Sequence, residues 1–128
     1  MLIHTPVSVG EVIDKLTILQ IKSERIDDSD KLVNIRKEQS LLAEILEKDV
    51  LSSNELAELT NQLKRINEQL WEVEDRLREL ERQQDFGQDF IADARAVYFT
   101  NDKRSRIKRK INELVGSDIV EEKSYRPY

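Results

Sequence analysis

Apolar residues recur at alternating steps of three and four positions, without interruption, through one long segment of the chain. The series is Leu56, Leu59, Leu63, Ile66, Leu70, Val73, Leu77 and Leu80. A 3.5-residue repeat kept over several heptads is typical of a coiled-coil or long bundle seam. At about 1.5 Å of rise per residue this segment would span roughly 37 Å. The sequence therefore predicts one long helix, from about residue 53 to 83, around which the fold is organised.

Capping and turn residues predict three further helices. Ser8 and Glu11 form a capping-box pattern that starts a helix reaching to about Ile26. The other boundaries come from similar signals: a turn at 27–30, a helix over 31–48, a second capping box at 52–55, a turn at 85–88 and a last helix that Gly116 ends.

Composition favours a single helical domain. The chain has 128 residues, of which only three are Gly and two Pro, with 38% apolar and 37% charged side chains. A β-sandwich or barrel needs more turn residues than this. We therefore expect one all-α domain over 1–128: an elongated four-helix bundle with a long helical hairpin, an extended N-terminal stretch at 1–7 and a polar tail at 117–128.

Several functional classes are disfavoured. The chain has no Cys and only one His, His4, so disulfides, thiolate catalysis, Cys-ligated metals and a histidine-based triad lack their residues. No Glu-x-x-His pair exists for a di-iron bundle site, and we expect neither a metal nor a cofactor. A net charge of -5 argues against general nucleic-acid or acidic-membrane binding. Without a long apolar run or a signal-peptide pattern, we expect a cytoplasmic protein.

The first predicted helix is apolar on all sides. A helical wheel places Val12, Leu16, Leu19 and Ile26 on one face and Ile13, Ile18 and Ile21 around the rest. Such a helix is expected at the centre of the fold, and so short a chain offers few helices to cover it. A symmetric homodimer would supply the missing cover.

The last predicted helix is polar where its core side is expected. Six of the eight residues over 103–110 are basic. This run could be a solvated helix face, a strip that binds phosphate or another anion, or, less favourably, a nucleic-acid contact without aromatic residues for base stacking. If it faces the bundle instead, it must meet carboxylates such as those of the first helix.

Polar groups of the first and last helices form one candidate centre. A charge within the first helix needs a partner if buried, so it predicts either a structural ion pair or a polar pocket. The residues assigned to this centre are Glu11, Asp14, Lys15, Arg95, Tyr98, Asn101, Asp102, Arg104 and Lys108.

Residues 8–22 resemble the opening of a small bacterial family of uncharacterised helical proteins. Residues 70–75, 90–98 with Asn101 and Asp102, and 121–125 are similar to its later blocks. The resemblance covers most of the chain and implies no catalytic or ligand residues. Residues 12–16 alone are similar to the first helix of helical chorismate mutases, which carry an early Arg, whereas the first Arg here is Arg25.

Two main functional hypotheses follow. The first is a non-enzymatic helical interaction or scaffold protein that acts as a homodimer and captures a protein partner. The second is a protein that binds, or an enzyme that acts on, an anionic, sugar-like small molecule such as a phosphorylated sugar at the candidate centre. Nucleic-acid binding through 103–110 is a third and weaker hypothesis, and no membrane association is expected.

Overall fold

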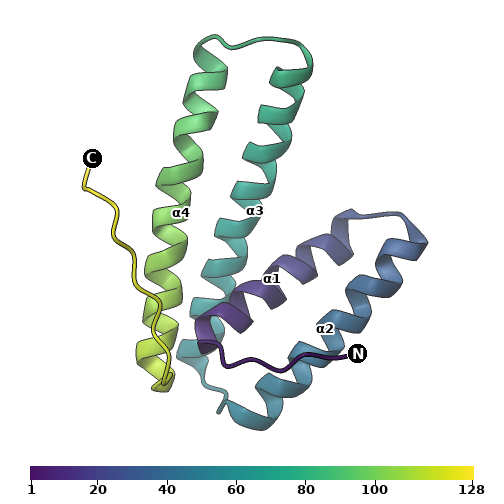
Figure 1. Cartoon of the computed structure of the whole chain (residues 1–128), viewed down its shortest axis with the longest axis vertical. Helices are drawn as coiled ribbons and strands as arrows, with labels where there is room; N and C mark the ends of the chain where they lie inside the picture. The colour runs from purple at the N-terminus through teal and green to yellow at the C-terminus, as the bar shows by residue number, and fades with distance from the viewer.

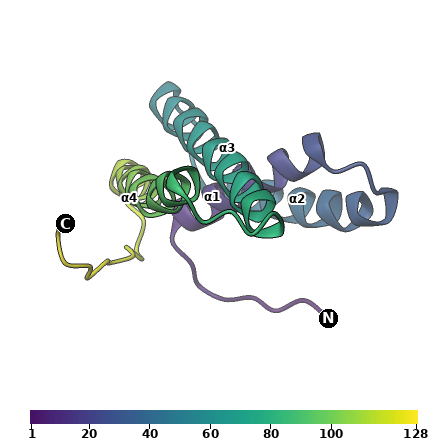
Figure 2. The ribbon, with the colours of Figure 1, turned by 90° about the horizontal axis from the view of Figure 1, so that it is seen from above.

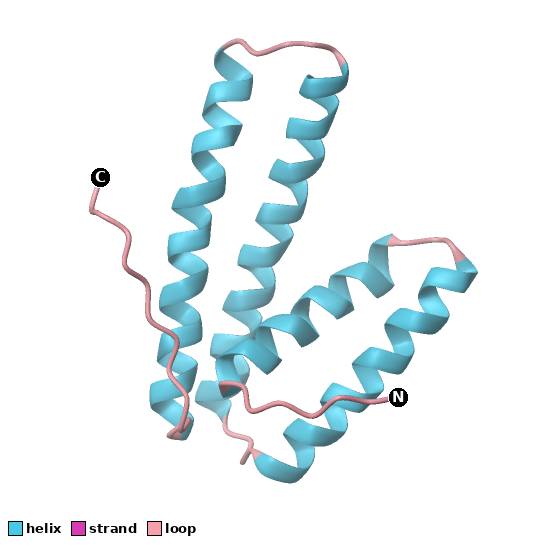
Figure 3. Ribbon diagram, viewed as in Figure 1, coloured by secondary structure: helices cyan, strands magenta, loops and turns pink.

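The computed structural model describes all residues 1–128 and contains helices and loops but no strands (Figure 3). The helices are α1 (Val9–Arg25), α2 (Ser29–Asp49), α3 (Asn54–Arg82) and α4 (Gln88–Val115) (Figure 1). The all-α fold class and the four predicted helices are confirmed. The long heptad segment lies, as predicted, within one helix, α3.

Side chains define where three of the helices begin. Ser8 Oγ accepts a 3.2 Å hydrogen bond from the Glu11 amide at the start of α1, while Asp28 and Ser53 cap α2 and α3. Neither expected capping box is complete, because Glu11 contacts Lys108 instead and Ser53 rather than Ser52 caps α3. Helix α4 ends at Gly116, whose positive φ of 68° favours glycine.

The helices form two hairpins that lean away from one another (Figures 1 and 2). Helices α3 and α4 pack along each other, and α1 packs against α2, α3 and α4. Helix α2 packs against α1 alone. The predicted central position of α1 is therefore confirmed, and α2 remains open to solvent on its other sides.

A small apolar core lies where α1 crosses the α3–α4 hairpin. Ile13, Leu63, Ile107 and Ile111 form its buried cluster, and half-buried residues such as Leu46 pack around it. On α1 the most buried side chains include Ile21 and Ile13, whereas Leu16, placed on the buried face by the helical wheel, is only half-buried. The directions in which α2, α3 and α4 cross α1 decide which of its positions are buried. A single face on a helical wheel does not identify them.

Candidate functional site at the junction of three helices

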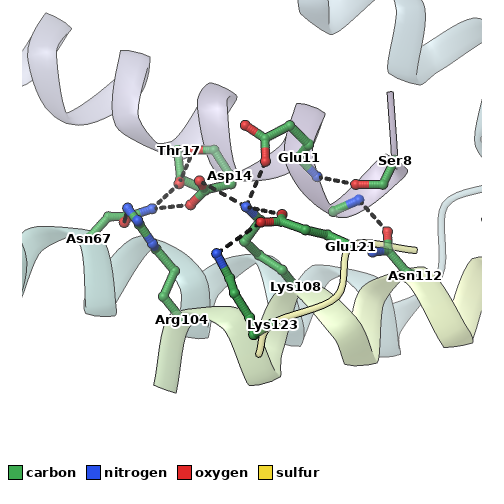
Figure 4. A network of polar contacts seen from close by, with 11 residues as sticks. Ser8, Glu11, Asp14, Thr17, Asn67, Arg104, Lys108, Asn112, Glu121 and Lys123 are labelled. Atoms are coloured by element: carbon green, nitrogen blue, oxygen red, sulfur yellow. Dashed lines mark hydrogen bonds and ion pairs between the residues drawn. The ribbon is translucent and has the colours of Figure 1, made fainter. Parts of the chain in front are cut away.

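Polar side chains from α1, α3 and α4 meet beside the apolar core (Figure 4). The close approach of α1 to α4 depends on Gly10: a Cβ there would lie 2.7 Å from the carbonyl oxygen of Lys108. The Gly10 amide donates a 2.7 Å hydrogen bond to Oδ1 of the buried Asn112. Together these contacts fix the first turn of α1 against the last turns of α4.

Asp14 and Asn67 form the buried half of the junction. Asn67 Nδ2 donates hydrogen bonds to Asp14 Oδ1 at 2.8 Å and to Thr17 Oγ1 at 2.9 Å. Arg104 Nη1 donates a longer bond, 3.4 Å, to Asn67 Oδ1. The amide of Asn67 therefore connects the carboxylate on α1 with the guanidinium on α4.

Lys108 is the central cation of the junction. Its Nζ lies 2.6 Å from Glu11 Oε2, 3.8 Å from Asp14 Oδ2 and 3.3 Å from Glu121 Oε2, and its side chain is 12% exposed. Burial alone would lower the pKa of the Lys108 ammonium, but the hydrogen bond to Glu11 and the three negative charges outweigh that effect and raise it. Lys108 is therefore a permanent positive charge at neutral pH, unsuited to act as a general base.

The C-terminal tail closes the outer side of the junction. Glu121 forms ion pairs with Lys108 and with Lys123, whose Nζ lies 2.9 Å from Glu121 Oε1. The hydrogen bond from Lys123 and the charge of Lys108 lower the pKa of the Glu121 carboxyl, so this group stays ionised.

Four residues of the predicted polar centre come together in the structure: Glu11, Asp14, Arg104 and Lys108. Asn101 lies near them, because it lines two hollows together with Arg104. The prediction that polar positions of the first and last helices face each other agrees with this placement.

The other predicted residues lie elsewhere. Lys15 points toward α2, with Nζ 3.6 Å from Glu38 Oε1, because it sits about 100° around α1 from Asp14. The guanidinium of Arg95 stacks over the ring of Phe99, 5.6 Å from its centroid. Tyr98 contacts Tyr128 of the tail in a second cluster outside the junction. Asp102 accepts a hydrogen bond from Tyr128 in that cluster and also lines a small hollow with Arg104 and Lys108 at the edge of the junction.

Several junction residues were not anticipated from the sequence. These are Asn67, Asn112 and Ser117, together with Tyr128 in the second cluster. Asn67 directly follows Ile66 of the long apolar series. This polar position beside the series was the sequence signal for one of these residues. The structure shows the acid-rich segment 121–125 folded back on α4.

A groove of about 460 Å³ begins on the other side of Arg104. Its lining includes Trp71, Asn67, Asn101 and Arg78, together with two carboxylates of α3, Glu74 and Asp75. Trp71 is half-buried, and the guanidinium of Arg25 lies 6.0 Å from its ring centroid. Arg104 has no carboxylate within 4.0 Å, so its charge is available to this groove.

The chemistry of the junction is that of binding and positioning. Every buried side-chain nitrogen and oxygen has a hydrogen-bond partner, and no group of three or more His, Asp or Glu side chains could hold a metal ion. The groups present can instead hold a negatively charged group at Arg104 or a protein segment along α4.

Comparison with protein families gives one match. A model for a family of unknown function, DUF6165, covers residues 3–127. The chain belongs to the DUF6165 family. The expected membership in an uncharacterised family is thereby confirmed, and the match spans both hairpins and the tail of this DUF6165 chain. Searches of the curated proteins and of the solved structures give no match. No helix is long and apolar enough to span a membrane.

Proposed function

We propose that this DUF6165 protein is a non-enzymatic helical interaction protein that acts as a homodimer, and we assign it to the bacterial cytoplasm on the sequence arguments above. The observation that carries the proposal is the large, partly apolar surface that the single chain leaves exposed.

The exposed area is large for the mass. The chain exposes 9422 Å², whereas a compact monomer of 15.0 kDa would expose about 7,000 Å². Extended segments at both ends contribute part of this difference, and the open sides of α2 contribute another part. A standard interface takes about 800 Å² from each partner, so a second copy would fit within the difference.

An apolar groove of about 920 Å³ marks where the second copy would sit. It lies between the N-terminal segment, the end of α2 and the end of α4. Val7, Ile45, Leu51 and Ile119 line it, and all four are exposed, Leu51 at 92%. A two-fold interface must be self-complementary. Leu51 stands at the groove's rim, so in a symmetric pair each copy's Leu51 would enter the groove of the other.

The uncovered sides of α2 give a second argument for a homodimer. Because α2 packs on α1 alone, Val33 and Ile45 of this helix remain exposed, Ile45 where it lines the groove. Most helical stability in proteins comes from packing rather than from intrinsic propensity. A second copy packed against α2 would supply the missing contacts.

Molar mass in solution tests the proposal. We expect the wild-type chain to have twice the monomer mass by light scattering, and the double variant Ile45→Glu/Leu51→Glu to have the monomer mass with its helical circular dichroism retained. The matched control is Ile91→Glu, which places the same charge at an exposed apolar position of α4 away from the groove. A wild-type monomer, or an unchanged mass in the double variant, would contradict the proposal.

The groove beside Trp71 supports a second candidate function. This function is the binding of an anionic, sugar-like small molecule such as a phosphorylated sugar. Its volume of about 460 Å³ falls in the usual range for ligand sites. It combines an aromatic ring with Arg104, a guanidinium that lacks a carboxylate partner, and guanidinium groups suit phosphate oxygens.

Thermal unfolding with sugar phosphates and dicarboxylates tests this candidate. A ligand at 100 times its Kd adds about 2.7 kcal/mol and raises the midpoint by several degrees. We expect Arg104→Ala to abolish that shift, and Arg36→Ala, an exposed arginine of α2, to retain it. A panel without any shift, or a shift that survives Arg104→Ala, argues against this site.

A further inference from the structure

The tail after Gly116 has no regular secondary structure and runs back alongside α4 (Figure 1). Two acidic residues of the tail meet two basic residues of α4. Glu121 Oε2 lies 3.3 Å from Lys108 Nζ, and Glu122 Oε2 lies 3.0 Å from Arg109 Nη1. The tail thus binds α4 as an extended acidic segment.

The end of the tail is held by a second set of contacts. The ring of Tyr128 packs on Phe99, with centroids 4.8 Å apart, and on Tyr98 at 5.6 Å. Its hydroxyl donates a hydrogen bond to Asp102. The tail therefore combines an acidic pair with an aromatic residue six positions later, each seated at its own place on α4.

The basic surface of α4 is larger than the tail covers. We call Arg104, Arg106, Lys108 and Arg109, which line two hollows beside the tail, the basic face. Only Lys108 and Arg109 have carboxylates within 4.0 Å, which leaves Arg104 and Arg106 unpaired. A small polar hollow of about 180 Å³ lies between this face and the tail, lined by Ser105, Arg106, Lys108 and Asn112 together with tail residues.

The tail is held weakly. Glu121 and Glu122 are 44% and 73% exposed in their side chains, and an ion pair between two exposed groups, as Glu122 forms with Arg109, contributes about 0–1 kcal/mol. The tail also leaves Arg104 and Arg106 of the basic face without a carboxylate partner. An acidic segment with more carboxylates than the tail would pair more of these cations.

We propose that the basic face of α4 is a docking surface for an acidic, extended segment of a partner protein, and that the chain's own tail occupies this surface until the partner displaces it. The proposal deepens the interaction function by naming the partner's chemistry. The basic face lies along α4, whereas the dimer groove includes only the first tail residues, such as Ile119, so measurements of peptide binding and of molar mass distinguish the two claims.

A labelled peptide copying residues 117–128 is the probe for this surface. The full-length variant Glu121→Gln/Glu122→Gln weakens the internal tail without changing its length. The control, Glu44→Gln/Glu47→Gln, makes the same change in charge at exposed positions of α2 that lack ion pairs. We expect the tail variant to bind the peptide about tenfold more tightly than wild type, the effect of roughly 1–2 kcal/mol from the two pairs. The control should match wild type.

Two further arms make the test decisive. Adding Arg106→Glu to the tail variant should remove the gain, since Arg106 is an unpaired member of the basic face. Equal binding by the tail variant and the control would overturn the proposal. So would preferential binding of a DNA duplex with a steep salt dependence, which would assign the face to nucleic acid.

Molar mass measured on the same samples separates the two claims. The tail variant should keep the wild-type mass, and Ile45→Glu/Leu51→Glu should leave peptide binding unchanged. If the tail variant instead loses half of a dimer's mass, the tail crosses between copies, and its displacement within one chain is wrong.

Discussion

The amide of Gly10 donates a 2.7 Å hydrogen bond to Oδ1 of Asn112, which joins the start of α1 to the end of α4 across 102 residues of sequence. The contact exists because Gly10 has no Cβ to meet the Lys108 carbonyl. The polar junction and the apolar core both depend on this approach, since α1 carries Asp14 and Ile13 into them.

Gly10→Ala should therefore destabilise the protein. Alanine normally stabilises a helix interior by about 1 kcal/mol relative to glycine, but here its methyl group would lie 2.7 Å from a backbone oxygen. We expect a loss of about 1–3 kcal/mol in the free energy of unfolding, measured with urea. Gly87→Ala is the control, because its Cβ would meet only an Asp85 side-chain oxygen at 3.2 Å. A gain in stability at position 10 would show that α1 does not approach α4 so closely.

Lys108→Met should be strongly destabilising. Methionine keeps the length of the side chain but leaves the buried Asp14 carboxylate without its only cation within 4.0 Å. Removing one partner of a buried ion pair costs about 3 kcal/mol or more. Lys110→Met, at an exposed position of α4 without an ion pair, should change stability by no more than about 0.5 kcal/mol. Equal effects of the two substitutions in urea unfolding would mean that the junction contributes no stability.

Leu63→Ala should open a cavity in the core. Leu63 is fully buried against α1 and α4, and such truncations cost about 2–5 kcal/mol. Leu114→Ala, at a position 39% exposed, should cost much less. A larger loss of unfolding free energy in Leu114→Ala than in Leu63→Ala would contradict the position of this core.

The Glu121 carboxyl should titrate below its ordinary value of 4.5. A lowered pKa means that the ionised form is favoured when the tail is docked, so this stabilisation is present at neutral pH and is lost as the pH falls through the Glu121 pKa. An NMR titration of the side-chain carboxyl carbon measures it directly. Lys123→Ala should move the pKa upward, because Lys123 donates the main hydrogen bond, whereas Lys31→Ala on α2 should not. A Glu121 pKa that is ordinary in the wild type would show an undocked tail.

The helices were predictable because their signals are local. Caps such as Ser8 and Asp28, the seam from Leu56 to Leu80, and Gly116 each act within one or two turns of chain. The central place of α1 was also predictable, since a helix with apolar residues on all sides must be covered on all sides.

The junction was predictable only in part. Asp14 and Lys108 could be matched because each was a charge where apolar residues were expected. Asn67, Asn112 and the contacts of Tyr128 depend on where α1 crosses the hairpin and how the tail returns, and a helical wheel contains neither crossing angle nor register. Lys15 was misplaced for the same reason, because the wheel does not show that α2 lies on its side of α1.

Sedimentation equilibrium of the wild-type chain, over a wide range of concentrations, tests the central claim most directly. The monomer mass is 15.0 kDa. The dimer proposal predicts twice that mass at high concentration, falling toward the monomer value only on strong dilution. A single species of monomer mass at every concentration would contradict it.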